Sequence, residues 1–253
     1  MISSEQRKEQ ILARVNTEGY VQVTALAEML GVTTATIRSD LTEMEKDGLL
    51  HRVHGSAMSV SPIATERLLL DKEKENIDKK KRIGKAAQKF LCGVDNIFVL
   101  SGSTVMAFVK EMDHSLNMSV FTVSLPTASH ICSYPNISVH FLGGVVHHQS
   151  LSVRGEYSSQ MIDSINIPLL FLGADGLSDD MVTCSNVEEA IFTKRLVSSS
   201  MKTILLCDSS KFGRSGVGRI CSYSDIDVLI TDSDILPSDL DALRRSGVEV
   251  ITV

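Results

Sequence analysis

Apolar residues near the start of the chain recur at the three- and four-residue spacing of amphipathic helices. A stripe within residues 4–16 predicts a first helix, and a stripe at residues 23–30 predicts a second. Gly31 stands where a left-handed turn residue would end the second helix, and Thr33 is a favourable N-cap for a third helix that Gly48 ends. Because the three stripes can face one another, they predict a small helical domain with a single core.

A short hairpin with basic residues follows the third predicted helix, at residues 49–60. The order of helix, tight turn, helix and hairpin is that of a winged helix-turn-helix, whose recognition helix, here the third, enters the DNA major groove. The pattern alone leaves a three-helix protein-docking domain as the alternative. For DNA, the candidate contacts lie on the outer face of the third helix and on the hairpin. They are Thr34, Thr36, Arg38, Ser39, Arg52 and His54.

Short apolar runs alternate with helical patterns in the rest of the chain. The runs cover residues 96–100, 118–123, 137–142, 168–173, 202–207, 227–231 and 249–253. Continuous apolar strands between amphipathic helices predict an α/β domain with a largely parallel sheet. We therefore expect a DNA-binding domain at residues 1–60, a charged helical linker at 61–89 and an α/β domain at 90–253.

Small, hydroxyl-bearing and charged residues follow five of these runs, and parallel sheets bind ligands in the loops beyond the ends of their strands. The Ser-Gly-Ser-Thr loop at 101–104 opens a helix, so its backbone N–H groups could hold an anion, although it lacks the ending of a Walker A loop. Lys211 could add a point charge for a phosphate, and Asp175 with Glu188 or Glu189 could accept hydrogen bonds from sugar hydroxyls. Together these residues predict a pocket for a small phosphorylated sugar or polyol.

The residues expected to bind this effector are Ser101, Gly102, Ser103, Thr104, Ser124, Gly143, Gly144, Asp175, Gly176, Glu188 and Lys211. Two structural alternatives remain open at this point. The two glutamates could form an exposed helix face, and Lys211 could make a structural ion pair with Asp208.

Charge and composition exclude several other classes of protein. Residues 1–60 hold 6 Lys and Arg against 8 Asp and Glu, so any DNA contact depends on a few placed cations. The N-terminus is polar and no apolar run is long enough to span a bilayer, which favours a cytoplasmic protein without a membrane partner. The five cysteines form no CxxC pair, and the seven histidines show no recognisable metal spacing, so we expect neither a metal site nor a cofactor.

At this point the motifs match a known family: the chain resembles the DeoR family of bacterial sugar-metabolism regulators over essentially its full length. The N-terminal matches are Arg7, Ile11, TIRSDL at 36–41, GLL at 48–50 and RVHG at 52–55. The C-terminal matches are SGST at 101–104, TVSLPTA at 122–128, LGG at 142–144, FLGADG at 171–176, EEA at 188–190 and DSSKFGR at 208–214.

The resemblance implies a winged helix-turn-helix joined to a sensor domain whose fold is shared with ribose-5-phosphate isomerase and glucosamine-6-phosphate deaminase. Members usually repress a catabolic operon and release DNA when a phosphorylated sugar binds. By resemblance, Ser101–Thr104 is the phosphate loop, Lys211 lies near it and Asp175 faces the sugar. A homo-oligomer, dimer or tetramer, is expected from the family and from the symmetry of operators.

Three positions depart from the family pattern, and each carries an expectation. Ser39 replaces a basic residue of the recognition helix, and Ser56 replaces a wing glycine, where it would be strained if that position needs a positive φ. Val123 replaces an asparagine, which would remove an amide from the rim of the pocket. An enzyme alternative, a sugar-phosphate isomerase or deaminase with an N-terminal appendage, is less favoured because no single loop gathers an acid–base cluster.

Overall fold

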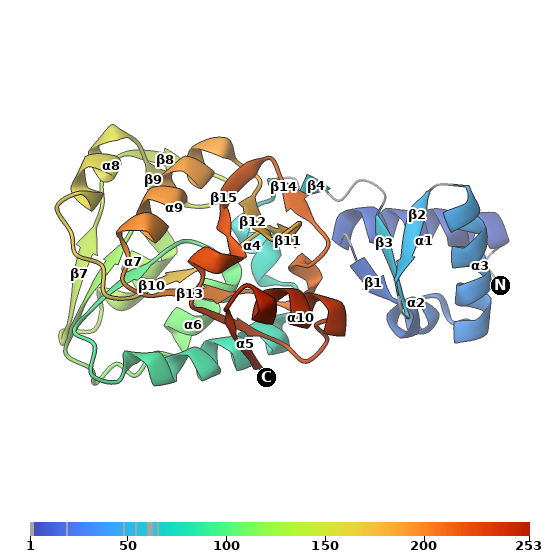
Figure 1. Cartoon of the computed structure of the whole chain (residues 1–253), viewed down its shortest axis with the longest axis horizontal. Helices are drawn as coiled ribbons and strands as arrows, with labels where there is room; N and C mark the ends of the chain where they lie inside the picture. Colours follow the sequence, from blue (N-terminus) through green and yellow to red (C-terminus); the bar gives the residue numbers. More distant parts are fainter. Residues whose placement is uncertain (1–2, 19, 48, 54, 60–62, 65) are drawn as a thin grey trace.

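The computed structural model describes residues 3–253 apart from 19, 48, 54, 60–62 and 65, and it shows a small N-terminal and a larger C-terminal domain (Figure 1). The small domain contains α1 (Ser4–Glu18), β1 (Tyr20–Gln22), α2 (Val23–Leu30), α3 (Thr34–Lys46), β2 (Leu50–Val53) and β3 (Ser56–Ser59). Its strands form an antiparallel sheet in the order β1-β3-β2. The three predicted helices and the hairpin are confirmed, and β1 adds a strand that its three residues were too few to predict.

The local signals of the small domain work as the sequence indicates. Gly31 adopts a φ of 64° and ends α2, and the Thr33 side chain accepts a hydrogen bond from the Thr36 N–H at the start of α3. Ile11, Leu26 and Ile37 are completely buried, one from each helix. The three helices therefore share the single core that the apolar stripes predict.

A buried ion pair fixes the orientation of α3. Arg7 on α1 donates from Nε to Asp40 Oδ2 at 2.5 Å and from Nη2 to Asp40 Oδ1 at 2.9 Å. Asp40 faces inward from α3, where it is almost completely buried. Since the two-pronged geometry permits one relative orientation of the guanidinium and carboxylate groups, the pair sets the angle at which α3 leaves the core.

The C-terminal domain is built on a seven-stranded sheet in the order β17-β16-β13-β10-β5-β6-β7. Its strands are β5 (Asn96–Val99), β6 (Met118–Thr122), β7 (Ile137–Phe141), β10 (Leu170–Leu172), β13 (Thr203–Leu206), β16 (Val228–Thr231) and β17 (Glu249–Thr252). Every neighbouring pair in this sheet is parallel. The seven apolar runs of the sequence thus correspond to the seven strands, and the predicted α/β fold is confirmed.

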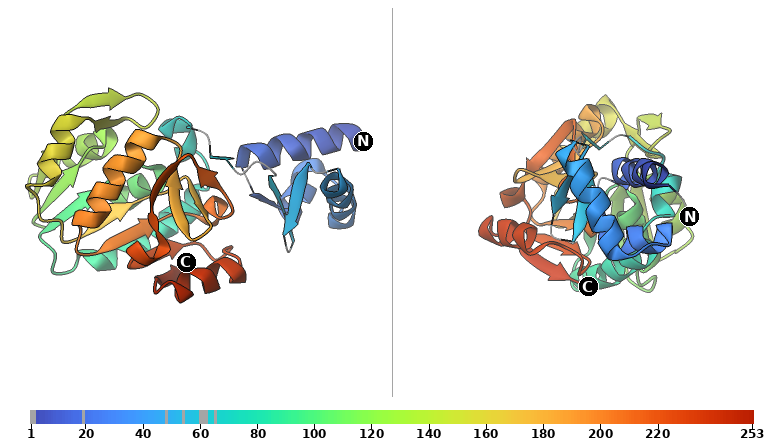
Figure 2. Two further views of the ribbon diagram at one scale, coloured as in Figure 1. Left: turned by 45° about the horizontal axis from the view of Figure 1, so that its top comes forward. Right: turned by 90° about the vertical axis from the view of Figure 1, so that its right-hand side faces the viewer.

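Helices cover both faces of this sheet, as Figure 2 shows from two directions. The helices are α4 (Leu69–Glu73), α5 (Ile77–Ala87), α6 (Ser103–Lys110), α7 (Leu125–Ile131), α8 (Glu156–Ile162), α9 (Val187–Ser199) and α10 (Pro237–Arg245). One apolar core lies between the sheet and α5, α6 and α7, and a second lies between the sheet and α8, α9 and α10. Because both faces are covered, the strands are apolar throughout instead of alternating.

Smaller sheets surround the edge of the main sheet where its strands end. A three-stranded antiparallel sheet contains β11 (Gly176–Ser178), β12 (Met181–Cys184) and β15 (Gly218–Ser222). A hairpin joins β8 (Val145–His147) to β9 (Ser152–Arg154), and β4 (Ile63–Ala64) pairs in parallel with β14 (Ser215–Gly216). The pairing of β4 with β14 brings the chain that leaves the small domain against the larger one.

The segment predicted to be a charged linker, residues 61–89, is largely part of the C-terminal domain. Ile83 and Ala87 are completely buried in the core, and Gly84 lies so close to α6 that an added Cβ would stand 2.8 Å from the Ala107 backbone. Lys79 pairs with Asp232 at 3.0 Å and Asp234 at 2.8 Å. The apolar side of α5 packs against the sheet. Some lysines of this segment are therefore paired or buried within the domain instead of facing solvent.

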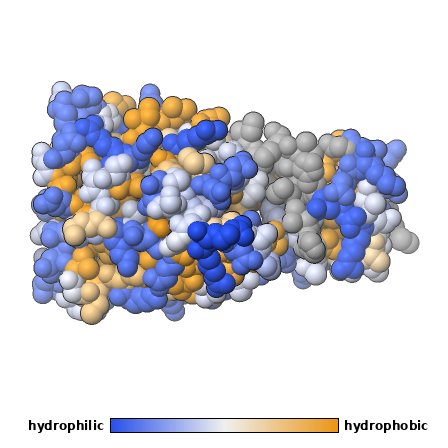
Figure 3. All heavy atoms as spheres, viewed as in Figure 1, coloured by the Kyte–Doolittle hydropathy of each residue, from blue (hydrophilic) through white to orange (hydrophobic). Residues whose placement is uncertain are grey.

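The outer end of the small domain, over α3, is mostly hydrophilic in the space-filling view (Figure 3). In the part of the chain that the structure describes, each helix is too short or too polar to cross a bilayer.

Candidate nucleic-acid interface and ligand pocket

The outer face of α3 carries the candidate DNA contacts. Arg38 and Ser39 are exposed, while Thr34 and Thr36 are half-buried near the start of the helix. The hydroxyl groups of Thr33 and Thr36 lie 2.9 Å apart, so Thr36 also takes part in the cap. An exposed cation beside small polar side chains on a helix of this length suits entry into a major groove.

The wing is attached to the same helix. Arg52 on β2 donates from Nη1 to the Thr42 hydroxyl at 2.6 Å, and its backbone N–H donates to Glu45 Oε1 at 2.8 Å. The predicted contact His54 lies outside the described residues. Arg52 therefore stands beside the recognition helix and fixes the wing against it.

Ser56 does not carry the strain that its replacement of a glycine suggested. It is absent from the residues with positive φ among those described, whereas its neighbour Gly55 has a φ of 76°. Ser56 is buried, and its hydroxyl donates to the Tyr20 hydroxyl at 2.7 Å. The wing turn needs only one glycine, and serine adds a hydrogen bond between β3 and β1.

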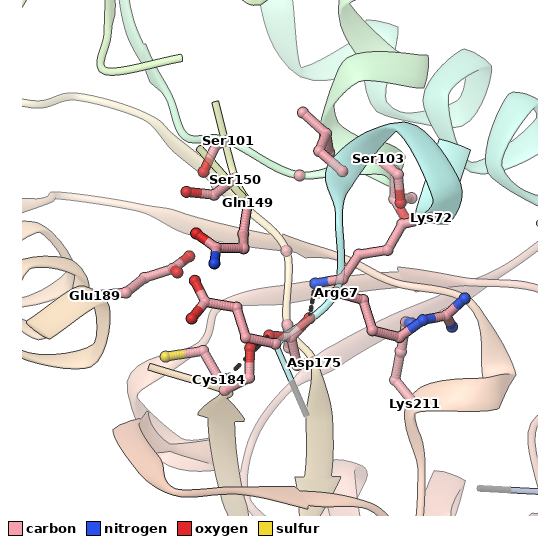
Figure 4. Close-up of a pocket in the computed structure, with 17 residues that line it drawn as sticks. Arg67, Lys72, Ser101, Ser103, Gln149, Ser150, Asp175, Cys184, Glu189 and Lys211 are labelled. Carbon is pink, nitrogen blue, oxygen red and sulfur yellow. Dashed lines mark hydrogen bonds and ion pairs between the residues drawn. The ribbon is translucent and has the colours of Figure 1, made fainter. Parts of the chain in front are cut away.

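A pocket lies where strands of the main sheet end, and loops after β5, β10 and β13 line it (Figure 4). Six of the predicted effector residues line it: Ser101, Gly102, Ser103, Thr104, Asp175 and Lys211. In the close-up, Arg67 and Lys211 lie on the side opposite Glu189 and Cys184, and Lys72 reaches between them to Asp175. The pocket thus has a basic side and an acidic side.

The other five predicted residues do not line this pocket. Ser124 is buried and caps α7 by accepting from the Thr127 N–H, and Gly144 and Gly176 pack against the backbone of Arg154 and Arg214. Gly143 lies in the loop after β7, also outside the lining. Small residues at strand ends also serve turns and close packing, so their residue types alone do not place them at a pocket.

The structure corrects the prediction that Glu188 faces the effector pocket, because its neighbour Glu189 lines the pocket instead. The Glu188 side chain is 76% exposed and stands 4.0 Å from His147. Successive residues of a helix point about 100° apart, so only one of the two glutamates can face the pocket. The structure also corrects the expectation that position 123 lies at the rim of the pocket. Val123 is buried in the apolar core and does not line the pocket.

Ten lining residues were not predicted from the sequence, in addition to Glu189, which the sequence offered only as the alternative to Glu188. They are Glu66, Arg67, Leu69, Lys72, Gln149, Ser150, Gly173, Ala174, Cys184 and Ser185. Four of them precede α5, in the segment interpreted as a linker. Gly173 and Ala174 belong to the recognised loop after β10, so adjacency to Asp175 was the only available signal for them.

Asp175 is the most strongly held carboxylate of the pocket. Oδ1 accepts from Lys72 Nζ at 2.6 Å, and Oδ2 accepts from the Ser185 backbone N–H at 3.0 Å and hydroxyl at 2.6 Å. Burial alone would raise the pKa of Asp175, but Lys72 and Ser185 outweigh it and lower the pKa to about 2. Asp175 is therefore ionised and can only accept hydrogen bonds at neutral pH.

Glu189 also lines the pocket, but its pKa is shifted in the opposite direction from that of Asp175. Arg154 donates from Nη2 to Glu189 Oε2 at 3.2 Å, from Nη1 to Asn186 Oδ1 at 3.0 Å and from Nη2 to Ser150 Oγ at 3.0 Å. Burial raises the pKa of Glu189 despite the Arg154 charge. Arg154 therefore joins the β8–β9 hairpin to α9 and fixes Glu189 at the pocket wall.

The Ser-Gly-Ser-Thr loop leads directly into α6, with Gly102 as its N-cap. Gly102 has a φ of 142°, which favours glycine, and its carbonyl accepts the Met106 N–H at 2.8 Å as α6 begins. The first N–H groups of a helix lack partners within the helix and point toward any anion placed before it. The predicted pair between Lys211 and Asp208 is not among the ion pairs of the described residues, where Asp208 instead accepts from Asn76 and Ser210.

A buried lysine lies behind the pocket and gives a test of the structure through pH. Lys80 donates from Nζ to the Lys72 carbonyl oxygen, and burial lowers the pKa of Lys80 from 10.5 to about 8. Between about pH 8 and pH 10.5, Lys80 has lost its proton in the folded protein but keeps it in the unfolded chain. The free energy of unfolding therefore rises with pH over this window. We expect the free energy of unfolding of the wild type, relative to Lys80→Met, to rise by about 3 kcal/mol over this window. Urea unfolding at each pH measures it, and parallel pH profiles for the two proteins would contradict it.

A winged helix-turn-helix joined to an α/β domain with a polar ligand pocket defines a ligand-responsive DNA-binding regulator. The profile of the DeoR-like helix-turn-helix domain matches residues 7–62, and that of the DeoR C terminal sensor domain matches residues 75–233. The chain belongs to the DeoR family. The second match begins before residue 90, in agreement with the packing of α5 into the sensor domain.

The chain is similar over nearly its full length to two bacterial transcriptional regulators. A putative aga operon transcriptional repressor of Escherichia coli O157:H7 is 32% identical over 252 residues, covering 98% of this chain and 93% of that protein. An uncharacterized HTH-type transcriptional regulator, YulB of Bacillus subtilis strain 168, is 32% identical over 249 residues, which cover 98% of this chain and 96% of that protein. Ribose 5-phosphate isomerase A of Methanocaldococcus jannaschii aligns with a TM-score of 0.40 and 19% identity over 55% of each chain.

Proposed function

We propose that this protein represses a carbohydrate-catabolism operon and leaves its operator when a phosphorylated sugar or polyol binds the pocket. One observation carries the effector class. The Ser-Gly-Ser-Thr loop at the start of α6 and the ammonium group of Lys211 face the same small pocket as the carboxylates of Asp175 and Glu189. A phosphate needs the first set of groups, and sugar hydroxyls suit the second.

The names of similar proteins support the same class of regulated genes. They include the putative aga operon transcriptional repressor and lactose phosphotransferase system repressors of Staphylococcus epidermidis, the latter 29% identical over 97% of this chain. The contacts of Asp175 disfavour the enzyme alternative. Lys72 and Ser185 both donate hydrogen bonds to its carboxylate and lower its pKa, so it stays ionised. A catalytic acid or base works best with a pKa near the operating pH.

The DNA contacts follow from the exposed face of α3 and from the wing. Thr34, Thr36, Arg38 and Ser39 would read the major groove, with Arg52 and His54 at the neighbouring backbone. A homodimer would place two such helices on half-sites one DNA turn apart, which raises the affinity that one acidic domain can reach alone.

The deciding experiment is fluorescence anisotropy of the full chain on labelled DNA from upstream of its own gene, at fixed salt. The compounds to add are glucose 6-phosphate, fructose 6-phosphate, galactose 6-phosphate, galactosamine 6-phosphate and glycerol 3-phosphate, with inorganic phosphate and glucose as controls. We expect specific binding that one sugar phosphate releases by roughly 30- to 150-fold, corresponding to a coupling of about 2–3 kcal/mol.

Binding no tighter than to a scrambled duplex would overturn the repressor assignment for this DNA. Tight binding that none of these compounds changes would contradict the effector class.

A further inference from the structure

The effector pocket is nearly filled by the protein itself. Its volume is about 60 Å³, whereas sites for small molecules enclose about 300–1,000 Å³. Arg67, Leu69 and Lys72 occupy one wall, and Figure 4 shows Lys72 crossing the pocket to Asp175. A phosphorylated sugar cannot enter this arrangement unless some of these side chains leave.

The occupying residues belong to one short segment, residues 66–75, which contains α4 and is called the plug here. Leu69 is buried, and its backbone N–H donates to the Gln149 carbonyl at 2.7 Å. Lys72 is paired with Asp175 at 2.6 Å, and the buried Lys80 donates to the Lys72 carbonyl. The plug is therefore attached to the pocket by a backbone hydrogen bond, a buried side chain and an ion pair.

The plug is also close to the contacts between the two domains. The strand β4, which ends two positions before the first residue of the plug, pairs with β14. Arg214, next to β14, is buried and donates from Nη1 to the Glu18 carbonyl at the end of α1, at 3.1 Å. The plug is therefore connected through β4, β14 and Arg214 to the DNA-binding domain.

We propose that residues 66–75 are an internal occupant of the effector pocket, and that effector binding expels them and so repositions the DNA-binding domains. The proposal rests on the proposed function, since it gives the mechanism of that same site. The effector's hydroxyl groups compete with Lys72 for the Asp175 carboxylate, and its bulk displaces Leu69. The plugged arrangement is the one that binds the operator.

This arrangement supplies the difference in affinity that any switch requires. A ligand shifts two states only by as much as it prefers one of them, and the plugged pocket has no room for a sugar phosphate. Coupling is reciprocal, so a change that loosens the plug lowers operator affinity even without effector.

The test compares Lys72→Met with Lys194→Met in the full chain. Methionine keeps the length of the Lys72 side chain and removes the ammonium group that pairs with Asp175. Lys194 is the matched control, because it is an exposed lysine of α9 that lies outside the plug and outside the lining of the pocket. Without effector, we expect Lys72→Met to speed hydrogen exchange of residues 66–75 and to weaken operator binding by roughly 5- to 10-fold, the lower end of typical couplings. Lys194→Met should leave both unchanged.

Adding the sugar phosphate that releases the operator gives a second readout in the wild type. We expect exchange to slow at residues 101–106 and to accelerate at residues 66–75. A segment that simply closes over a ligand would slow at both places, so that result would overturn the plug. Faster exchange in Lys72→Met with unchanged operator affinity would overturn the coupling. Failure of the wild type to bind any operator duplex would instead overturn the proposed function, and this inference with it.

Discussion

Arg38→Ala should remove most of the specific operator binding and leave the fold intact. The guanidinium is the exposed cation among the candidate contacts on α3, and Ile37 and Leu41 beside it stay buried in the core. An arginine that reads a base edge contributes about 1–3 kcal/mol, so we expect operator affinity to fall roughly 5- to 150-fold per lost contact. A dimer would lose the contact in both half-sites. Anisotropy titrations on operator and scrambled duplexes measure the effect.

The control for this change is Arg244→Ala. Arg244 is also exposed, but it lies in the last turn of α10, on the sensor domain. It should leave operator affinity and its salt dependence unchanged. An Arg38→Ala protein with wild-type affinity and salt slope would show that α3 does not enter the groove, and it would favour the protein-docking alternative.

Apolar spacing was sufficient to predict most of the fold. Helical stripes identified three helices, and Gly31 and Thr33 gave two of their ends. Continuous apolar runs identified all seven strands of the parallel sheet, because a sheet covered on both faces has no polar positions to interrupt them. Spacing did not identify β1, whose pairing with β3 depends on contacts distant in sequence.

The candidate pocket was only partly predictable, for a related reason. Loops that follow strands directly, such as 101–104 and 173–175, come together at one edge of the sheet by topology alone. Lys72 reaches the same pocket from α4 and Arg67 from the segment just before it, and a run of charged residues gives no indication that two of them turn inward. The choice between Glu188 and Glu189 depends on the exact rotation of α9, which residue types do not determine.

Lys211→Met should separate effector binding from operator binding. Lys211 follows β13 in the turn Ser209–Lys211 and lines the pocket beside Arg67. Three nearby lysines already have partners. Lys72 pairs with Asp175, Lys79 pairs with Asp232 and Asp234, and Lys80 donates to the Lys72 carbonyl oxygen. Lys211 forms no ion pair with the residues that the structure describes, so its ammonium is available to an anion.

A hydrogen bond to a charged group contributes about 1.5–3 kcal/mol, so the effector concentration needed for half-release should rise roughly 10- to 100-fold in Lys211→Met. Operator affinity without effector should match the wild type, because the residue lies on the sensor domain and the plug keeps its own partners. Lys194→Met, an exposed change on α9, is the matched control and should change neither quantity. Unchanged release would place the phosphate elsewhere, and a loss of operator binding as well would show that Lys211 supports the plugged arrangement rather than the effector.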